Sequence, residues 1–245
     1  MTPLVLLHAF PLDAQMYRGV IGAMAGEALT PDLPGFGGTA RPHDEPSMDE
    51  YADALASELD RVGVGQVVLG GTSMGGYVAM AFCRRYGDRV AGLALIDTKA
   101  SADTAEAAEM RSTMASIMER DQSTDPLVEM VLPKLLGATT VATRPEVAEQ
   151  VLGWVRDAPP ASAAWAQRAM AERPDSMQTL RALDVPAVVI VGAEDVLSPP
   201  ADAEAMASAL PDAELIVIDA VGHLTPVEAP AAVAQALDGL MSRVQ

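Results

Sequence analysis

The sequence contains a single cysteine, Cys83, in 245 residues. One cysteine cannot form an internal disulfide bond, so nothing in the composition requires an oxidising compartment, and a reduced cytoplasm is the expected location. Long apolar runs are missing from the beginning of the chain as well. Residues 1–10 have no positively charged region, and their apolar run is too short for a signal peptide or a membrane span. We therefore expect a soluble, unprocessed protein with no membrane partner.

Basic residues are also scarce, with 16 Lys and Arg against 34 Asp and Glu, and the net charge is −18. This balance excludes a nucleic-acid partner, because gathering phosphates requires a local excess of basic residues and no basic patch is present. The charge is uneven: −6 over residues 1–98, −3 over residues 99–181 and −9 over residues 182–245. Four cations of the middle segment are candidates to meet an anionic substrate: Lys99, Arg111, Lys134 and Arg168. Pairing with nearby acids on solvated helix faces is the more common role of such residues.

The composition that is present suits one large domain. Hydrophobic residues make up 50% of the chain and charged residues 20%, which is enough for a single core at this length. The same values exclude a collagen, a disordered tail and a small disulfide-stabilised domain.

Short apolar runs alternate with segments of helical spacing along most of the chain. The apolar runs predict strands at residues 4–7, 28–33, 66–70, 90–96, 187–191 and 214–218. Helices are predicted at residues 16–26, 48–61, 74–86, 201–210 and 230–241, the second of them with Ser47 as N-cap and Glu50 at its third position. This alternation predicts an α/β fold with a mainly parallel sheet of about six strands and helices on both faces. The strands are rich in Val, Leu and Ile, which indicates that both of their faces are buried.

Residues 103–175 interrupt the alternation. They contain no convincing strand, and prolines divide them into several helical stretches. We therefore expect a helical cap inserted into a core that is formed by residues 1–102 and 176–245. The stretch is rich in methionine, at Met110, Met114, Met118, Met130 and Met170. Flexible methionines suit an adaptable apolar wall over a cleft, and they suit an ordinary helical core as well.

The first chemical motif is Gly71-Thr72-Ser73-Met74-Gly75, which lies between an apolar strand and a predicted helix. In that context Gly-x-Ser-x-Gly predicts a tight turn that exposes the serine hydroxyl at the carboxyl end of the strand. The N-terminus of the following helix offers unpaired N–H groups to a developing negative charge. Ser73 is therefore the candidate nucleophile.

A serine nucleophile needs a base, and the chain has only three histidines. His223 follows the last predicted strand and is therefore placed at the same sheet edge as Ser73. His8 also ends a strand, but it precedes a turn and is expected to be a hydrogen-bonded structural residue. His43 lies in a polar loop beside proline and is expected to be a solvated surface residue. Elimination favours His223 as the base.

The imidazole of the base needs a carboxylate that fixes its tautomer and stabilises its cation. Asp195 lies in the loop after the predicted strand 187–191, and this loop position makes it the favoured candidate. Asp97, which follows the strand 90–96, remains the competitor, because both acids satisfy the chain order of serine, acid and histidine. The neighbouring Glu194 is expected to lie on a solvated face.

Several of these segments together resemble one known superfamily. They are His8-Ala9-Phe10-Pro11, the turn at residues 32–37, the serine motif, the loop from Gly192 to Asp195, and Gly222-His223. Together they resemble the α/β-hydrolase superfamily along the whole chain except for the insert. Within that superfamily the resemblance is to small esterases, enol-lactonases and cofactor-free haloperoxidases.

The resemblance implies further features of the site and of the sheet. It assigns the backbone N–H groups of Phe10 and Met74 to the oxyanion hole. The segment at His8 usually has the sequence His-Gly-Phe-Pro in relatives, so Ala9 is a departure from the pattern. Alanine has a narrower range of allowed φ and ψ angles in this loop than glycine. The chain begins at what is the third strand of the relatives, so we expect six parallel strands without the usual N-terminal hairpin, and the cap after the fourth strand.

The residue type of the nucleophile indicates the reaction. Dehalogenases and epoxide hydrolases of this fold have aspartate where Ser73 stands, so halide displacement is disfavoured. Serine points to acyl transfer: a serine hydrolase that cleaves a small carboxylic ester or lactone through an acyl-enzyme, with no cofactor and no metal. The alternatives are a cofactor-free perhydrolase or haloperoxidase, in which peroxide replaces water, and a ligand-binding homologue that retains the pocket without turnover.

Overall fold

The computed structural model describes residues 2–42 and 45–244. Six strands form one parallel sheet in the order β2-β1-β3-β4-β5-β6. Their bounds are β1 Leu4–Leu7, β2 Ala28–Leu29, β3 Val67–Thr72, β4 Val90–Ile96, β5 Ala187–Gly192 and β6 Ala213–Ile218. The predicted α/β fold and its six parallel strands are confirmed. Because all strands point the same way, the loops that follow them gather at one edge of the sheet.

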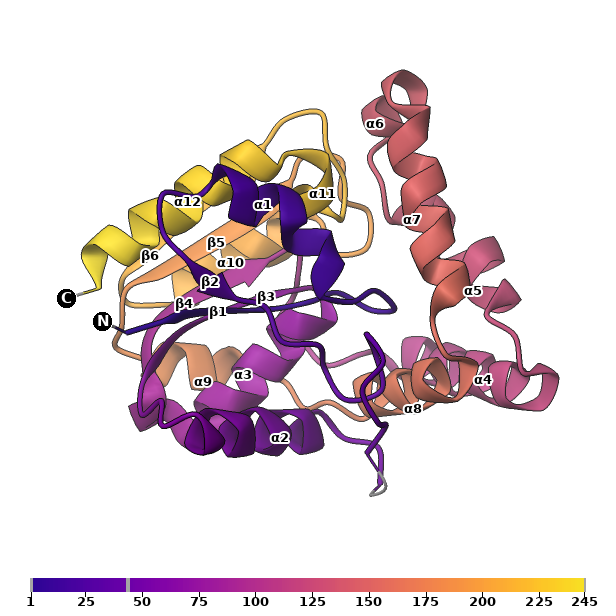
Figure 1. Ribbon diagram of the computed structural model, residues 1–245, viewed down its shortest axis with the longest axis horizontal. Coiled ribbons are helices and arrows are strands. Elements are labelled where there is room, and N and C mark those ends of the chain that lie inside the picture. The colour runs from indigo at the N-terminus through magenta and orange to yellow at the C-terminus, as the bar shows by residue number, and fades with distance from the viewer. Residues whose placement is uncertain (1, 43–44, 245) are drawn as a thin grey trace.

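Helices cover both faces of this sheet (Figure 1). On one face lie α1 (Arg18–Ala23) and α12 (Pro230–Arg243), which pack against each other. On the other face lie α2 (Met48–Arg61), α3 (Met74–Tyr86) and α9 (Met177–Ala182), and α10 (Pro200–Ala209) packs against α9, β5 and β6. Three short helices complete this part: η1 Ala14–Tyr17, η2 Gly87–Arg89 and α11 Thr225–Glu228.

The central strands are buried on both faces, as predicted, but the two edge strands are not. Every residue of β1, β3 and β5 is buried, whereas β6 has no fully buried residue. The other edge strand, β2, has only two residues, so the strand expected at residues 28–33 was too long. Pro31 follows within two residues and has no N–H group for a ladder hydrogen bond, which ends the pairing.

The first helix also differs from the sequence prediction, whereas the cap of α2 agrees with it. The helix expected at residues 16–26 is divided into the 3₁₀ turn η1 and the short α1, because the side chain of Asp13 accepts a hydrogen bond from the Gln15 N–H and starts a tight turn. At the start of α2, the hydroxyl of Ser47 accepts a hydrogen bond from the Glu50 N–H at 3.2 Å, as the predicted capping pattern requires.

The helical insert, residues 103–175, consists of helices in the structure too. They are α4 Ala105–Asp121, α5 Asp125–Met130, η3 Leu132–Lys134, α6 Ala138–Thr143, α7 Pro145–Asp157 and α8 Pro160–Ala171. Prolines begin α7 and α8, where a missing N–H group costs no helical hydrogen bond. The insert lies beside the carboxyl ends of the strands (Figure 1). Its two ends are joined by a hydrogen bond of 2.8 Å from the Ser176 N–H to the Ala100 carbonyl oxygen.

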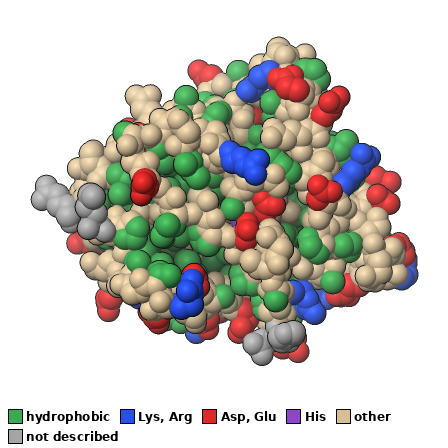
Figure 2. All heavy atoms as spheres, in the orientation of Figure 1, with side chains coloured by type: hydrophobic (Ala, Val, Ile, Leu, Met, Phe, Trp, Pro, Cys, Tyr) green, Lys and Arg blue, Asp and Glu red, His purple; other side chains and the backbone are tan. Residues whose placement is uncertain are grey.

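The surface agrees with the acidic composition. Acidic side chains are spread over the face in Figure 2, with basic side chains between them, and no histidine side chain is visible there. Among residues 2–42 and 45–244, no helix is both long enough and apolar enough to span a bilayer.

Two glycines provide a test of how closely the layers pack. A Cβ atom on Gly75, in α3, would lie 2.1 Å from the backbone oxygen of Leu7 in β1, whereas a Cβ atom on Gly153, in α7, would meet nothing within 4 Å. We expect Gly75→Ala to lower the free energy of unfolding by about 3 kcal/mol or more, because backbone atoms would have to move. Gly153→Ala is the matched control and should raise it by up to about 1 kcal/mol. Urea denaturation measures both values; equal effects of the two substitutions would contradict this packing.

Candidate active site

Ser73 occupies the sharp turn between β3 and α3. Its backbone has φ +53° and ψ −112°, and its N–H group donates a hydrogen bond of 2.9 Å to the Ile96 carbonyl oxygen. The turn is possible because its neighbours are glycines: a Cβ atom on Gly71 would lie 2.1 Å from the oxygen of Gly75. The predicted Gly-x-Ser-x-Gly turn is therefore present, and it places the serine hydroxyl at the edge where the strands end.

His223 lies within hydrogen-bond distance of both Ser73 and Asp195. Its Nε2 is 2.8 Å from the Ser73 Oγ, and its Nδ1 is 2.7 Å from the Asp195 Oδ2. The imidazole and the carboxylate are both buried, whereas Ser73 is half-buried. The three side chains come from the loops after β6, β5 and β3, and they form one continuous line of contacts.

The carboxylate of Asp195 is held on its other side by the backbone. Its Oδ1 accepts hydrogen bonds from the N–H groups of Leu197 at 2.8 Å and Ser198 at 3.0 Å. These contacts fix the carboxylate, so its Oδ2 is left to face His223.

Asp97, the competing acid, faces away from this line. Its Oδ1 accepts from the Gly192 N–H at 3.1 Å, and its Oδ2 accepts from the N–H and hydroxyl groups of Thr225 at 2.8 and 2.7 Å. It therefore connects the loop that bears Asp195 to the loop that bears His223. Burial, together with the negative charge of Asp195, raises the pKa of Asp97 well above its usual range.

The other two histidines do not join the site among the described residues. The Nε2 of His8 accepts a hydrogen bond from the Leu33 N–H at 2.9 Å, and its Nδ1 lies 3.0 Å from the Ala9 carbonyl oxygen. Burial lowers the pKa of His8, so this ring is held neutral as a structural link, which confirms the expectation of a hydrogen-bonded residue. The surface position expected for His43 lies outside the described residues.

The two backbone N–H groups expected at the oxyanion hole belong to buried residues. Phe10 follows β1 and lines the same cavity as Ser73, and Met74 is the first residue of α3. Neither N–H group donates a hydrogen bond within residues 2–42 and 45–244, so both are free to meet a ligand oxygen. Ala9 is not among the described residues with positive φ, so this position does not require the glycine that the resemblance implies.

Glu228 was not singled out in the sequence, although it holds the loop of His223. Its carboxylate accepts hydrogen bonds from the N–H groups on both sides of the histidine, Gly222 at 3.0 Å and Leu224 at 3.2 Å. It also accepts from the Gly137 N–H of the helical insert at 2.9 Å. The available signal was an acidic residue in the largely apolar segment 224–237, which suggests a buried carboxylate with backbone partners.

Glu194 was expected on a solvated face, and this was wrong. Its carboxylate is half-buried and accepts hydrogen bonds from the N–H group of Thr139 at 2.9 Å and from its hydroxyl group. These hydrogen bonds, with the Thr139 hydroxyl first, lower the pKa of Glu194. Glu194 and Glu228 thus attach the loops of Asp195 and His223 to the same end of α6.

A cavity of about 240 Å³ opens beside Ser73 and His223, between the sheet edge and the helical insert. Four methionines line it, namely Met110, Met114, Met130 and Met170. Met114 and Met170 are buried, whereas Met110 and Met130 are exposed, so the methionines form both the cleft wall and part of the core. Within the described residues, no group of His, Cys, Asp and Glu side chains is arranged to hold a metal ion.

Comparison with known proteins shows that this chain is similar to hydrolases. A family model described as "Alpha/beta hydrolase family" matches residues 4–236. A curated relative, the pimeloyl-[acyl-carrier protein] methyl ester esterase of Aromatoleum aromaticum, is 33% identical over 233 residues, which cover 90% of each chain. The solved structure of a thermophilic esterase from Thermogutta terrifontis, with malate bound, is 41% identical with a TM-score of 0.94, over 100% of this chain and 90% of that one.

A second group of similar proteins is named for lactone cleavage. The 3-oxoadipate enol-lactonase 2 of Acinetobacter baylyi is 24% identical over 86% of this chain and 77% of its own. The enol-lactonase structure from Burkholderia xenovorans LB400 has a TM-score of 0.87 at 22% identity, over 99% of this chain and 92% of that one. At this identity the structural likeness supports the fold alone.

The raised pKa of Asp97 predicts a pH effect on stability. The folded state binds the carboxyl proton of Asp97 more tightly than the unfolded state, in which the pKa of an aspartate is about 3.9. The wild type therefore loses stability as the pH rises from about 4 toward the pKa of Asp97 in the folded state. The side-chain amide that Asp97→Asn introduces does not titrate in this range. We therefore expect the difference in unfolding free energy between Asp97→Asn and the wild type to shift in favour of the variant as pH rises from about 4 to neutral. Urea denaturation across this range measures it, and a pH-independent difference would contradict the prediction.

Proposed function

The chain belongs to the alpha/beta hydrolase family, and from this premise we propose that it is a serine hydrolase that cleaves a small carboxylic ester or lactone through an acyl-enzyme. The observation that carries the proposal is the line of contacts from the Ser73 Oγ through His223 to Asp195, which opens on the cavity. The relatives named as esterases and enol-lactonases support an ester or lactone as substrate.

In the first step, the Ser73 hydroxyl attacks the carbonyl carbon of the substrate. His223 Nε2, at 2.8 Å, takes the hydroxyl proton, and Asp195 stabilises the imidazolium that forms through its contact with Nδ1. The negative charge on the carbonyl oxygen is stabilised by the free N–H groups of Phe10 and Met74.

In the second step, the tetrahedral intermediate collapses and His223 gives its proton to the departing alcohol oxygen. The acyl group remains on Ser73. A water molecule then transfers a proton to His223 and attacks the acyl carbon, which releases the acid and restores the serine hydroxyl. Neither step requires a metal or a cofactor.

The helical insert serves as a cap in this proposal, over a core formed by residues 1–102 and 176–245. Its entry and exit are fixed together not only by the Ser176 contact with Ala100 but also by Arg173, which donates to the Asp103 carboxylate at 2.8 Å. Glu194 and Glu228 attach α6 to the two loops that bear the acid and the base. The cap therefore positions the reacting groups as well as covering the substrate.

Substitution of the nucleophile tests the proposal. We expect Ser73→Ala to lower kcat for p-nitrophenyl acetate by about four orders of magnitude or more, because Ser73 carries the hydroxyl group that contacts His223 Nε2. Ser57→Ala, which alters an exposed serine of α2, is the matched control and should keep the wild-type rate. A cooperative thermal unfolding transition is the check that each variant is folded. Wild-type turnover by Ser73→Ala would overturn the proposal.

Substitution of the acid separates Asp195 from Asp97. Asp195→Asn should lower kcat by roughly 10³ to 10⁴, because an amide no longer stabilises the imidazolium or its correct tautomer. The effect on KM should be small, since Asp195 contacts His223 and not the substrate. Asp219→Asn, at an exposed acid after β6, is the control and should retain kcat. Near-normal turnover by Asp195→Asn, with a loss of this size in Asp97→Asn, would transfer the role to Asp97.

A further inference from the structure

Both lysines of the chain line the same cavity. The 245 residues include only Lys99 and Lys134, and both side chains form the wall of the cavity that contains Ser73 and His223. Lys99 follows β4, whereas Lys134 ends η3 in the insert, so two distant segments bring ammonium groups to one place. In a protein with a net charge of −18, this is a local reversal of the overall sign.

One carboxylate, Asp103, lies in the cavity wall beside Lys99 and Arg111 and also contacts Arg173, which lies outside this cavity. Its side chain is only 1% exposed, and its oxygens accept from Arg111 Nε at 2.6 Å and Arg173 Nη2 at 2.8 Å. Lys99 Nζ is farther away, at 4.0 Å from the same carboxylate. Burial raises the pKa of Asp103, but hydrogen bonding from Arg173 and the charge of Arg111 outweigh it and hold the pKa below its usual range. The carboxylate is therefore ionised and already occupied by two guanidinium groups.

The charges around Asp103 leave an excess of positive charge. One carboxylate faces three cations, so this cluster carries a net charge of +2, and Lys134 adds a further positive charge to the wall. Lys134 has no ion pair within residues 2–42 and 45–244. The expected pairing of the four cations with acids therefore holds for Arg111, for Arg168, which contacts Glu119 at 2.7 Å, and for Lys99, whose contact with Asp103 is the longest of these. It does not hold for Lys134 within the part of the chain that the structure describes.

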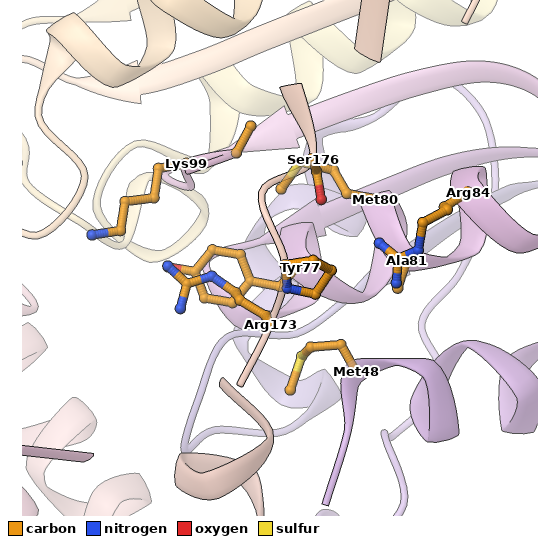
Figure 3. A pocket seen from close by; sticks show the side chains of 10 residues that line it. Met48, Tyr77, Met80, Ala81, Arg84, Lys99, Arg173 and Ser176 are labelled. Atoms are coloured by element: carbon orange, nitrogen blue, oxygen red, sulfur yellow. The ribbon is translucent and has the colours of Figure 1, made fainter. Parts of the chain in front are cut away.

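Lys99 lines both the cavity of Ser73 and a second pocket, which is the one drawn in Figure 3. In that view its side chain is extended, with its nitrogen directed away from Met80 and Ser176, and Arg173 lies flat against the ring of Tyr77. The side chain of Lys99 is 24% exposed, so its ammonium group is partly removed from water, and its ion pair with Asp103 is long, at 4.0 Å. An anion that enters the cavity gains a charge-assisted contact in a medium that screens charge less than bulk water.

We propose that this cavity binds esters or lactones that carry a second, negatively charged carboxylate group, held by Lys99 and Lys134. The inference rests on the proposed function, because it concerns the substrate of the same site. The methionine-lined part of the wall suits the apolar carbon chain between the two groups. Hydrolysis of a half-ester with the carboxylate on the acyl side consumes one water and yields a dicarboxylate, an alcohol and a proton. With the carboxylate on the alcohol side the products are a carboxylate, a hydroxycarboxylate and a proton, and a lactone opens to a hydroxydicarboxylate and a proton.

The kinetic test compares matched anionic and neutral esters. Monoethyl glutarate against ethyl valerate places the charge on the acyl side, and O-acetylglycolate against ethyl acetate places it on the alcohol side. We expect kcat/KM to favour the anionic member of one pair by about tenfold or more at low salt. The preference should arise from a lower KM for the anionic ester, and it should shrink at high salt because ions screen the lysine charges. The pair that shows the preference identifies the side of the scissile bond that carries the carboxylate.

Variants test whether the lysines cause the preference. Lys99→Met and Lys134→Met should each lower the ratio of anionic to neutral kcat/KM by about tenfold, and Lys99→Arg should retain more of it. Arg120→Met removes one exposed cation of α4, which pairs with Asp121 outside the cavity, and should leave the ratio unchanged. No preference in the wild type for either pair, or equal ratios in the lysine variants and Arg120→Met, would overturn the inference.

Equilibrium binding separates this inference from the proposed function. Calorimetry with glutarate and the Ser73→Ala variant requires no turnover. Binding that weakens with salt and is lost on Lys99→Met or Lys134→Met in that background supports the anion site, even if no ester is hydrolysed. Hydrolysis of neutral esters by the wild type, without glutarate binding by Ser73→Ala, would support the proposed function and overturn the anion site.

Discussion

The site depends on one constraint: backbone segments from distant parts of the chain must approach each other where the parallel strands end. Gly75 lies against the backbone of Leu7, and a Cβ atom on Gly192 would lie 2.1 Å from the oxygen of Gly222. These contacts hold the loops after β3, β5 and β6 at one edge of the sheet. Side chains on those loops then need no long reach to meet, so a serine and a histidine 150 residues apart lie within hydrogen-bond distance.

The same edge also couples the insert to the loops of the site. Glu194 precedes Asp195 and contacts Thr139, while Glu228 holds the loop of His223 and contacts Gly137. The start of α6 is thus attached to both loops, and a Cβ atom on Gly222 would lie 2.2 Å from the Gly137 nitrogen. In the proposed function, a displacement of α6 would therefore disturb the acid and the base together, so the cap is part of the catalytic framework.

Local sequence patterns predicted much of the sheet, and the expected fold and family resemblance are confirmed. The helix at residues 74–86 and the strand at residues 90–96 have the predicted bounds, because glycine turns and apolar runs mark them clearly. Edge strands were less predictable, since exposure depends on strand order, which no local pattern contains. Within the site, Asp97 and Asp195 both follow strands. The sequence favoured Asp195 but left Asp97 open, and the contact of Asp195 with His223, together with the contacts of Asp97 with Gly192 and Thr225, distinguishes them. The role of Glu228 was missed for the same reason, because its partners are backbone groups that a sequence does not place.

The central claim is that His223 and Asp195 activate Ser73 as a nucleophile, and a fluorophosphonate probe tests it without assuming a substrate. Intact-mass measurement with peptide mapping should show one phosphonyl group on the wild type, attached to Ser73. Ser73→Ala should remain unlabelled, and His223→Ala should react at least about 100-fold more slowly, because the general base is lost. A wild type that stays unlabelled, or that is labelled at another residue, would contradict the account.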